Sequence, residues 1–360
     1  MRRGHWIGLS TLMGSAVAAA GLARAYQRDM DEIRRLLEAA SQLAETRVGP
    51  VEYARYGEGL AALVVHGAGG GFDQGLMVGR ELLGEDFEIV APSRFGYLRT
   101  PVPSRHSPAV QADAHAGLLD QLGLDRAVVI GVSAGAPSAI ELALRHPERV
   151  SALILAVPRT WSPHDEVAVE DSPQSRLVLR SVLAGADFAF WLASKLARPS
   201  VVRFLGVPPA VDAQASEAER RRVAEIIRSI LPLSRRVGGI QVDSKHAIGP
   251  WPLERIAAPT LVISATDDLF NTLPGARYTA ERIPEAELVV LPSGGHLMVS
   301  RGDEVRAAIA AFLNRRLPAA KARSKQRSSA GPGGSSGRSQ RRSDARSALF
   351  STAPESAAGR

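Results

Sequence analysis

Short apolar runs rich in β-branched residues recur through the middle of the chain, and helical stretches separate them. The runs cover residues 63–65, 87–91, 127–131, 152–157, 260–264 and 287–291. Strands that are apolar on both faces are typical of a buried parallel sheet whose strands are joined by crossover helices. The pattern therefore predicts an α/β fold with a mostly parallel central sheet and helices on both faces. A further segment, residues 51–56, alternates apolar and polar side chains before Gly57, as an edge hairpin strand does.

Between residues 159 and 254 the alternation of strands and helices stops, and the sequence becomes helical and irregular. We interpret 159–254 as a helical cap inserted into an α/β core formed by residues 47–158 and 255–317. Because the insertion follows a strand, the cap is expected to overhang the carboxyl ends of the strands, where open α/β sheets bind ligands. Its aromatic residues either pack the interior of the cap or line an apolar pocket; they are Trp161, Phe188, Phe190, Trp191, Phe204 and Trp251.

The two ends of the chain differ in composition from its middle. Residues 1–25 include an apolar, alanine-rich stretch over 6–23 with arginines on both sides, which fits a membrane anchor, a cleaved export signal or an amphipathic helix. With an anchor or a signal, the positive residues Arg2 and Arg3 ahead of the stretch keep the N-terminus in the cytoplasm and place the body on the far side of the membrane. Residues 26–46 have the charged helical pattern of a stalk. Residues 318–360 are rich in Ser, Gly and Arg, which predicts a disordered basic tail.

The net charge of +7 comes from this tail. Residues 319–360 hold nine Lys or Arg and two acidic residues, which leaves the rest of the chain formally neutral. A neutral body has no basic face for tracking phosphates, so we expect no nucleic-acid binding by the globular part. The chain has no cysteine, which excludes a thiol nucleophile, a disulfide framework and a cysteine-based zinc site. No cofactor and no metal are called for.

A candidate nucleophile lies at Ser133, in the sequence GVSAG over residues 131–135. The apolar run before it predicts a buried strand, and the residues after it have a helical pattern. A sharp strand-to-helix turn strains the serine backbone and presents its hydroxyl group, and flanking glycines remove side chains that would collide. Gly131 and Gly135 occupy those flanking positions, so the context is the one that this motif requires.

A glycine-rich segment, HGAGGG at residues 66–71, follows the run at 63–65. Such a loop lets the backbone approach a substrate and turn an N–H group toward the negative charge of a tetrahedral intermediate. The N–H groups of Ala68 and Ala134 are the predicted oxyanion donors, with Gly69 as the alternative to Ala68. The segment lacks the G-x-x-x-x-G-K-[ST] pattern of a phosphate-binding loop. We expect His66 to orient the loop and not to act as the base.

The general base should follow the last strand, and His296 is the histidine with that position. A carboxylate that orients the base is expected at the end of the preceding strand, in the chain order Ser, Asp, His. The run at 260–264 leads to Asp267 and Asp268, and one of them is the orienting acid. The other aspartate is expected to cap the loop.

These motifs together resemble the α/β-hydrolase superfamily over residues 47–315. The segments that carry the resemblance are HGAGGG at 66–71, GVSAG at 131–135, ISATDD at 263–268 and GGH at 294–296. Alignment of Ala265 with the glycine of the family's G-x-x-D turn implies Asp268 as the acid. The segment SRFG at 93–96 resembles the D-x-x-G-x-G turn, with Ser93 in place of its aspartate, so the resemblance implies only a structural role there.

The resemblance implies hydrolysis through an acyl-enzyme, with a small to medium apolar carboxylic ester as the expected substrate. A serine nucleophile disfavours the dehalogenase and epoxide-hydrolase branches, which use aspartate. Alternatives are C–C bond hydrolysis or perhydrolysis by the same triad, a ligand-binding protein without catalysis, and a tail that tethers the protein to anionic polymers. An anionic substrate needs a basic residue in the cap; the candidates are Arg159, Lys195, Arg203 and Lys245.

Overall fold

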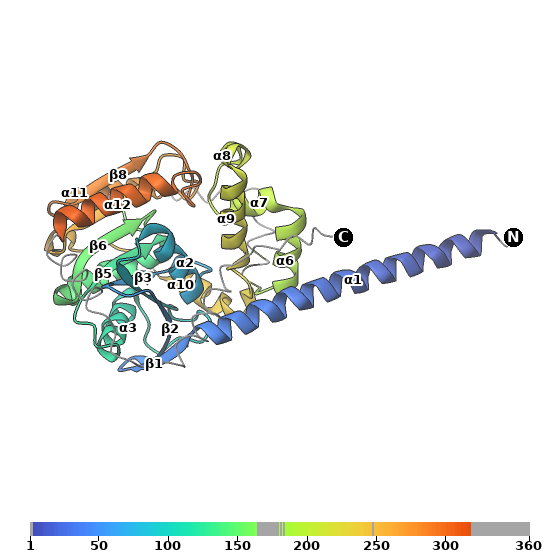
Figure 1. The fold of residues 1–360 in the computed structure, drawn as a ribbon, viewed down its shortest axis with the longest axis horizontal. Coiled ribbons are helices and arrows are strands. Elements are labelled where there is room, and N and C mark those ends of the chain that lie inside the picture. The colour runs from blue at the N-terminus through green and yellow to red at the C-terminus, as the bar shows by residue number, and fades with distance from the viewer. Residues whose placement is uncertain (1–2, 164–179, 181, 183, 247, 318–360) are drawn as a thin grey trace, which may run out of the picture.

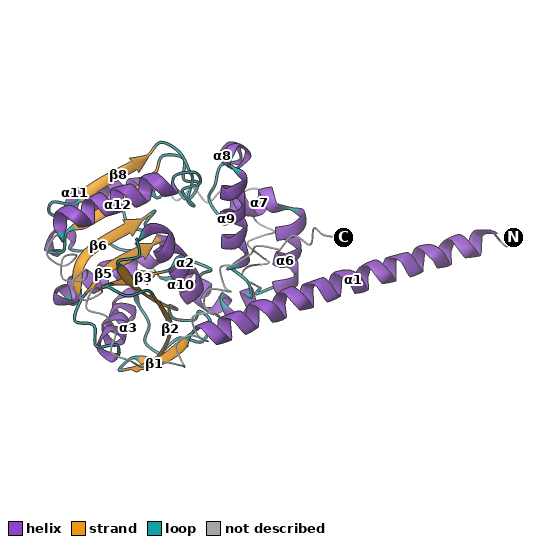
Figure 2. Ribbon diagram, in the orientation of Figure 1, coloured by secondary structure: helices purple, strands orange, loops and turns teal. Residues whose placement is uncertain are grey.

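The fold is built around one eight-stranded sheet with the order β1-β2-β4-β3-β5-β6-β7-β8 (Figures 1 and 2). The computed structural model describes residues 3–163, 180, 182, 184–246 and 248–317, with side chains from residue 17 onward. The strands are β1 (Gln42–Thr46), β2 (Gly49–Tyr56), β3 (Leu60–Val65), β4 (Phe87–Pro92), β5 (Ala127–Val132), β6 (Val150–Ala156), β7 (Thr260–Ala265) and β8 (Glu287–Leu291). All neighbours from β4 to β8 pair in parallel, which confirms the predicted mostly parallel sheet.

The first strand, β1, begins inside the range that the sequence assigned to the stalk. It pairs antiparallel with β2, which in turn pairs antiparallel with β4. β2 is therefore an interior strand, and β1 forms the edge of the sheet. Only Ala44 of β1 is buried, and Leu43 is exposed. A short strand with so little apolar character does not stand out from the charged helix before it.

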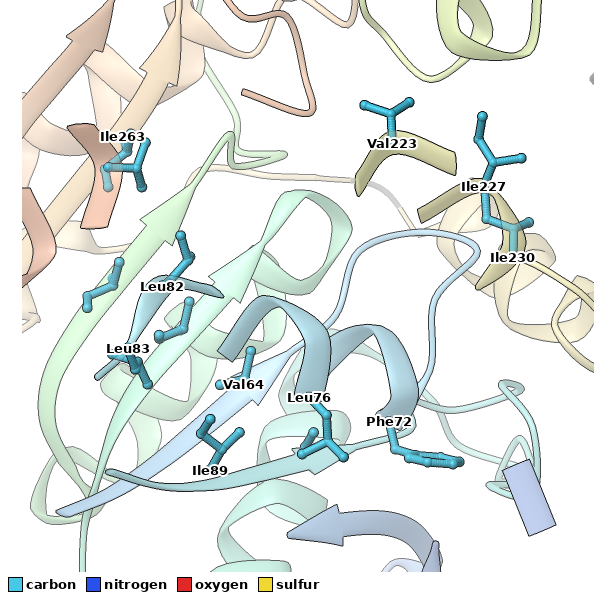
Figure 3. Packing of buried hydrophobic residues seen from close by; sticks show 14 of the residues in the cluster. Val64, Phe72, Leu76, Leu82, Leu83, Ile89, Val223, Ile227, Ile230 and Ile263 are labelled. Atoms are coloured by element: carbon cyan, nitrogen blue, oxygen red, sulfur yellow. The ribbon is translucent and has the colours of Figure 1, made fainter. Parts of the chain in front are cut away.

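Helices cover both faces of the sheet. α2 (Phe72–Leu82) and α12 (Gly302–Arg316) contribute to one buried cluster, and α3 (Pro108–Gln121), α4 (Ala136–Arg145) and α11 (Leu273–Arg282) contribute to the other. Alternate strand residues supply the two clusters, as Val64 does on the α2 side and Val65 on the α4 side. Figure 3 shows Leu76 of α2 beside Ile89 of β4. The strands from β3 to β7 are thus buried on both faces, as their continuous apolar runs indicate, whereas the edge strand β8 is buried only at Leu291.

The inserted region contains α6 (Asp187–Leu196), α7 (Arg198–Phe204), α8 (Pro209–Gln214), α9 (Glu217–Arg228) and α10 (Val237–Lys245). Residues 164–179 of the predicted cap and the predicted tail at 318–360 lie outside the described residues. Val223, Ile227 and Ile230 of the cap belong to the same buried cluster as Phe72 and Leu76 of the core (Figure 3). The cap and this face of the core therefore share one hydrophobic interior.

The helix α1 (Arg3–Ala40) packs on the body through its C-terminal half, and its N-terminal half extends away from it (Figure 1). From residue 17 onward, its buried side chains are Met30, Ile33, Leu37 and Ala40. Tyr26 packs edge-on against Trp191 of the cap. Within the described part of the chain, no helix is both long and apolar enough to cross a membrane. Residues 6–23, for which the sequence leaves an anchor, an export signal or an amphipathic helix open, lie within α1.

Candidate active site

Ser133 lies directly after β5, on the sharp turn into α4. Its φ angle of +49° places a non-glycine residue in the left-handed region. A Cβ atom at Gly131 would lie 2.8 Å from Ala139 Cβ, and one at Gly135 would lie 2.5 Å from the Val65 carbonyl oxygen. The turn is close-packed on both sides, so glycine is required at these two positions. The local sequence thus folds into the strained elbow that its pattern predicts.

Two hydrogen bonds connect Ser133 to His296 and Asp268, which come from three separate loops. The Ser133 Oγ lies 2.8 Å from His296 Nε2, and His296 Nδ1 lies 2.8 Å from Asp268 Oδ2. His296 and Asp268 are 9% and 7% exposed. The three loops follow the carboxyl ends of β5, β7 and β8, which a parallel sheet brings to one edge. The structure thus brings together the three residues that the sequence selects as the triad.

The two adjacent aspartates occupy different environments. Asp268 Oδ1 accepts a hydrogen bond from the Phe270 N–H at 2.9 Å, and Oδ2 accepts one from the Thr272 hydroxyl at 2.5 Å. Burial favours a higher pKa for Asp268, but His296 and these hydrogen bonds outweigh it and lower the pKa below its ordinary value. Asp268 therefore stays ionised beside the histidine.

Asp267 points to the other end of the histidine loop. Its carboxylate accepts hydrogen bonds from the backbone N–H groups of Gly294 and Gly295 at 3.2 and 2.8 Å. It holds the loop that carries His296 without touching the imidazole itself. This geometry favours Asp268 as the orienting acid and gives Asp267 the capping position.

The glycine-rich loop lies against the nucleophile. A Cβ atom at Gly67 would lie 3.3 Å from Ser133 Cβ. The Gly69 N–H faces the Tyr97 hydroxyl at 3.4 Å, whereas the Ala68 N–H has no hydrogen-bond partner among the described residues. Ala134 is the second residue of the 3-10 turn that begins at Ser133, so its N–H has no acceptor within the turn. Of the two alternatives on the loop, Ala68 is the one whose N–H is available.

His66 stands behind this loop and not in the site. It is fully buried, and burial together with the nearby Arg94 guanidinium lowers its pKa well below the ordinary value. A neutral ring then donates its Nδ1–H to the Gly67 carbonyl at 2.7 Å and accepts the Arg94 N–H at Nε2 at 3.0 Å. Both ring nitrogens are occupied, so His66 orients the loop.

A cavity of about 220 Å³ opens beside Ser133 and His296. Most of its lining is apolar and comes from both the core and the cap; it includes Met77, Val78, Leu82, Phe190, Phe204, Ile226, Ile230 and Ile240. The sequence left open whether aromatic residues of the inserted region pack its interior or line a pocket. Phe190 does both, since it is buried in the hydrophobic cluster and also borders the cavity.

Three polar side chains in this lining, Gln74, Glu81 and Arg222, were missed by the sequence analysis. Arg222 on α9 bonds to Glu81 of α2 at 3.2 Å, to Glu219 at 2.6 Å and to the Leu297 carbonyl at 2.8 Å. Burial raises the pKa of Glu81, although Arg222 opposes the change. Gln74 and Glu81 lie two helical turns apart on α2 and therefore share one face of the helix. This spacing was the feature of the sequence that could have identified Glu81 as a lining residue.

The basic residues proposed from the sequence for an anionic substrate lie elsewhere. Arg159, Lys195, Arg203 and Lys245 are not among the described residues that line this cavity. Arg159 instead donates to the Asp243 carbonyl at 2.8 Å. Among the described residues, no group of three or more His, Asp or Glu side chains has the arrangement of a metal site.

Comparison with known proteins places the fold and its motifs in one family. A family model described as "alpha/beta hydrolase fold" matches residues 63–302. A putative carbamate hydrolase RutD of Caulobacter sp. (strain K31) is 29% identical over 223 residues, covering 58% of this chain and 73% of the relative. A 2-hydroxymuconate semialdehyde hydrolase of Pseudomonas putida is 27% identical over 250 residues, covering 67% and 82%.

A solved structure agrees with this assignment. An alpha/beta hydrolase fold protein from Nakamurella multipartita is 30% identical, with a TM-score of 0.61 and coverage of 76% of this chain and 99% of that one. The family model spans the glycine-rich loop, the elbow, both aspartates and His296. The chain belongs to the α/β-hydrolase fold family.

Proposed function

We propose that this α/β hydrolase is a serine hydrolase that cleaves a small to medium apolar carboxylic ester through an acyl-enzyme. The observation that carries the proposal is the continuous hydrogen-bonded relay from Asp268 through His296 to Ser133, which opens onto an apolar cavity. A serine nucleophile needs a base within hydrogen-bond reach and a third group that orients the base. The relay supplies both.

Each member of the relay has one task in the reaction. Asp268 accepts the Nδ1–H of His296, which leaves Nε2 to take the proton of the Ser133 hydroxyl as Oγ attacks the ester carbonyl carbon. The carbonyl oxygen becomes an anion, and the N–H groups of Ala68 and Ala134 stabilise it. His296 then gives its proton to the departing alkoxide. His296 then takes a proton from a water molecule, whose oxygen attacks the carbonyl carbon of the acyl-enzyme. As the bond from that carbon to Ser133 Oγ breaks, His296 returns the proton to Oγ and the carboxylic acid leaves.

The charges around the cavity favour an uncharged substrate over an acidic one. Arg222 is the basic side chain in the described lining, and it is already bonded to two carboxylates and a carbonyl group. An acidic diketone would have to compete with Glu81 and Glu219 for this guanidinium. An apolar acyl chain instead gains free energy from contact with the rest of the lining.

The test is a panel of p-nitrophenyl esters of increasing acyl length, assayed beside a carbamate and an acidic diketone. We expect saturable ester hydrolysis, with kcat/KM rising by roughly fourfold per added methylene until the cavity is filled, since each buried methylene contributes about 0.8 kcal/mol. Ser133→Ala should lower kcat by roughly 10⁶-fold. A fluorophosphonate probe should label the wild type and not this variant.

The outcomes separate the alternatives. Equal background rates for wild type and Ser133→Ala would contradict hydrolysis by this site. Labelling without ester turnover, combined with turnover of the diketone, would assign the triad to C–C bonds. Absence of both probe labelling and substrate turnover would indicate a ligand-binding protein without catalysis.

A further inference from the structure

Arg94, in the loop after β4, lies directly behind the glycine-rich loop and is 5% exposed. Its Nε donates to the His66 carbonyl at 2.9 Å, and its Nη2 donates to the Gly67 carbonyl at 3.1 Å. The Gly67 carbonyl also accepts from His66 Nδ1 at 2.7 Å and from the Gly70 N–H at 3.3 Å. A guanidinium, an imidazole and one backbone N–H group therefore fix the direction of the peptide bond between Gly67 and Ala68.

That direction sets the oxyanion hole of the proposed hydrolase. In a trans peptide the C=O and N–H groups point to opposite sides. Because the Gly67 carbonyl is held toward Arg94, the Ala68 N–H of the same peptide points away from Arg94. Ala68 borders the cavity together with Ser133. Hydrogen bonds to a carbonyl group also polarise its peptide, which makes the Ala68 N–H a stronger donor.

The other side of Arg94 is held by the cap. Asp243 on α10 accepts from Arg94 Nη1 and Nη2 at 2.6 and 2.8 Å, and it accepts from the Tyr97 hydroxyl at 2.6 Å. Tyr97 in turn faces the Gly69 N–H. Burial and the neighbouring Asp243 raise the pKa of Tyr97 well above its ordinary value, so its hydroxyl keeps the proton that it donates. One carboxylate of the cap thus holds two side chains that each contact the loop.

We propose that Arg94 is a positioning residue for the oxyanion hole and that Asp243 couples it to the cap. The packing of the cap on the core then determines how strongly the Ala68 N–H stabilises the oxyanion. The inference rests on the proposed function. In a purely structural role, by contrast, the Arg94–Asp243 pair would stabilise the fold without affecting the rate of the chemical step.

A second ion pair in the molecule provides a matched control. Arg236 and Asp73 also join the cap to the core, are buried, and form two hydrogen bonds of 3.1 and 2.8 Å. Arg236 contacts the Leu231 carbonyl and does not bond to the carbonyls of residues 66 and 67. Loss of this pair should destabilise the protein without turning the Ala68 peptide.

The experiment compares two inhibitors on four purified variants: Asp243→Asn, Arg94→Lys, Tyr97→Phe and the control Asp73→Asn. An alkylboronic acid adds to Ser133 Oγ and presents an anionic oxygen to the oxyanion hole, whereas the primary alcohol of the same chain length fills only the apolar cavity. Wild type should bind the boronic acid much more tightly than Ser133→Ala does. If it does not, and esters are not hydrolysed, the proposed function itself fails, together with this inference.

With that function in place, Asp243→Asn and Arg94→Lys should weaken boronic-acid binding by roughly 10- to 100-fold. They should change alcohol binding less than twofold and lower kcat with little change in KM. Asp73→Asn should lower the thermal stability and leave the ratio of the two affinities unchanged. The inference would be overturned if Asp243→Asn and Arg94→Lys lost equal affinity for both inhibitors. It would also be overturned if Asp73→Asn lost affinity for the boronic acid but not for the alcohol. If Asp243→Asn and Arg94→Lys fail to fold, Tyr97→Phe provides the test. A ratio of boronic-acid affinity to alcohol affinity within twofold of the wild-type ratio would then contradict the coupling.

Discussion

At the scale of single residues, neighbours of the same type have separate tasks in this site. Asp268 binds the imidazole, while Asp267, one residue earlier, binds two backbone N–H groups of the loop that carries it. Ala68 and Gly69 divide in the same way, since only the Gly69 N–H faces the Tyr97 hydroxyl. A sequence pattern selects such a pair, and the direction of each side chain or peptide then decides which member does the chemistry.

The two aspartates should therefore respond differently to the same substitution. Asp268→Asn replaces the acceptor of the Nδ1–H with an amide that favours the wrong tautomer, and kcat should fall by roughly 10⁴-fold. Asp267→Asn keeps the relay but weakens two charge-assisted hydrogen bonds, so it should cost about 1–3 kcal/mol of unfolding free energy. Steady-state kinetics and urea unfolding of both variants test this. A larger loss of kcat in Asp267→Asn would reverse the assignment.

At the scale of elements, the segment between α7 and α8 supports the catalytic loops from the cap side. The Gly206 carbonyl accepts hydrogen bonds from the N–H groups of His296 and Leu269 at 3.0 and 3.1 Å. Gly206 has a φ angle of +82° and packs against the Phe270 ring, which lies edge-on to His296. The sequence does not predict this contact, because it joins a loop of the cap to loops that lie far along the chain.

Gly206→Ala tests this support. A Cβ atom there would lie 2.6 Å from His296 Cβ and 2.9 Å from the Phe270 ring, so the histidine has to shift. A displacement of about 1 Å in a catalytic group costs on the order of 100-fold in rate. Gly84→Ala is the control, since a Cβ atom at Gly84 has no atom within 4 Å. If kcat stayed within twofold of wild type in Gly206→Ala, the cap would have no part in holding His296.

At the scale of the whole molecule, the sequence predicts elements that adjacent residues mark and does not predict contacts between residues far apart in the chain. The runs that became β3 to β8, the elbow and the aspartates are each marked by neighbours in the chain. The ion pairs Arg94–Asp243 and Arg236–Asp73 join positions 149 and 163 residues apart. Nothing in the local pattern identifies such partners, so the sequence does not predict that Arg94 pairs with a carboxylate of the cap.

The stability of the whole molecule should depend on pH through His115 of α3. Burial, with a contribution from Arg94, lowers its pKa from 6.5 to about 3. Between these values the unfolded chain binds a proton that the folded chain does not, so stability falls as the pH falls through this range. The slope from this group is about 1.4 kcal/mol per pH unit. Urea unfolding of wild type and His115→Asn over this range checks the prediction, and equal slopes would contradict it.

The helix α1 links the core and the cap, and its two halves should differ in their effect on stability. Leu37 is 4% exposed within the cluster that includes cap residues, whereas Leu22, earlier on the helix, is 39% exposed. Nearby, Glu32 pairs with Arg228 of α9 at 3.0 Å. Leu37→Ala should therefore lower the unfolding free energy by about 2–5 kcal/mol. Leu22→Ala should change it by no more than about 0.5 kcal/mol.

Denaturant unfolding of both leucine variants measures these values, and ester kinetics on the folded proteins shows whether the effect reaches the site. Because Leu37 does not border the cavity beside Ser133, kcat of folded Leu37→Ala should match that of wild type. Equal, small losses of stability in the two variants would mean that α1 does not pack on the body in solution. A loss of kcat without a loss of stability would instead mean that α1 controls the position of the cap.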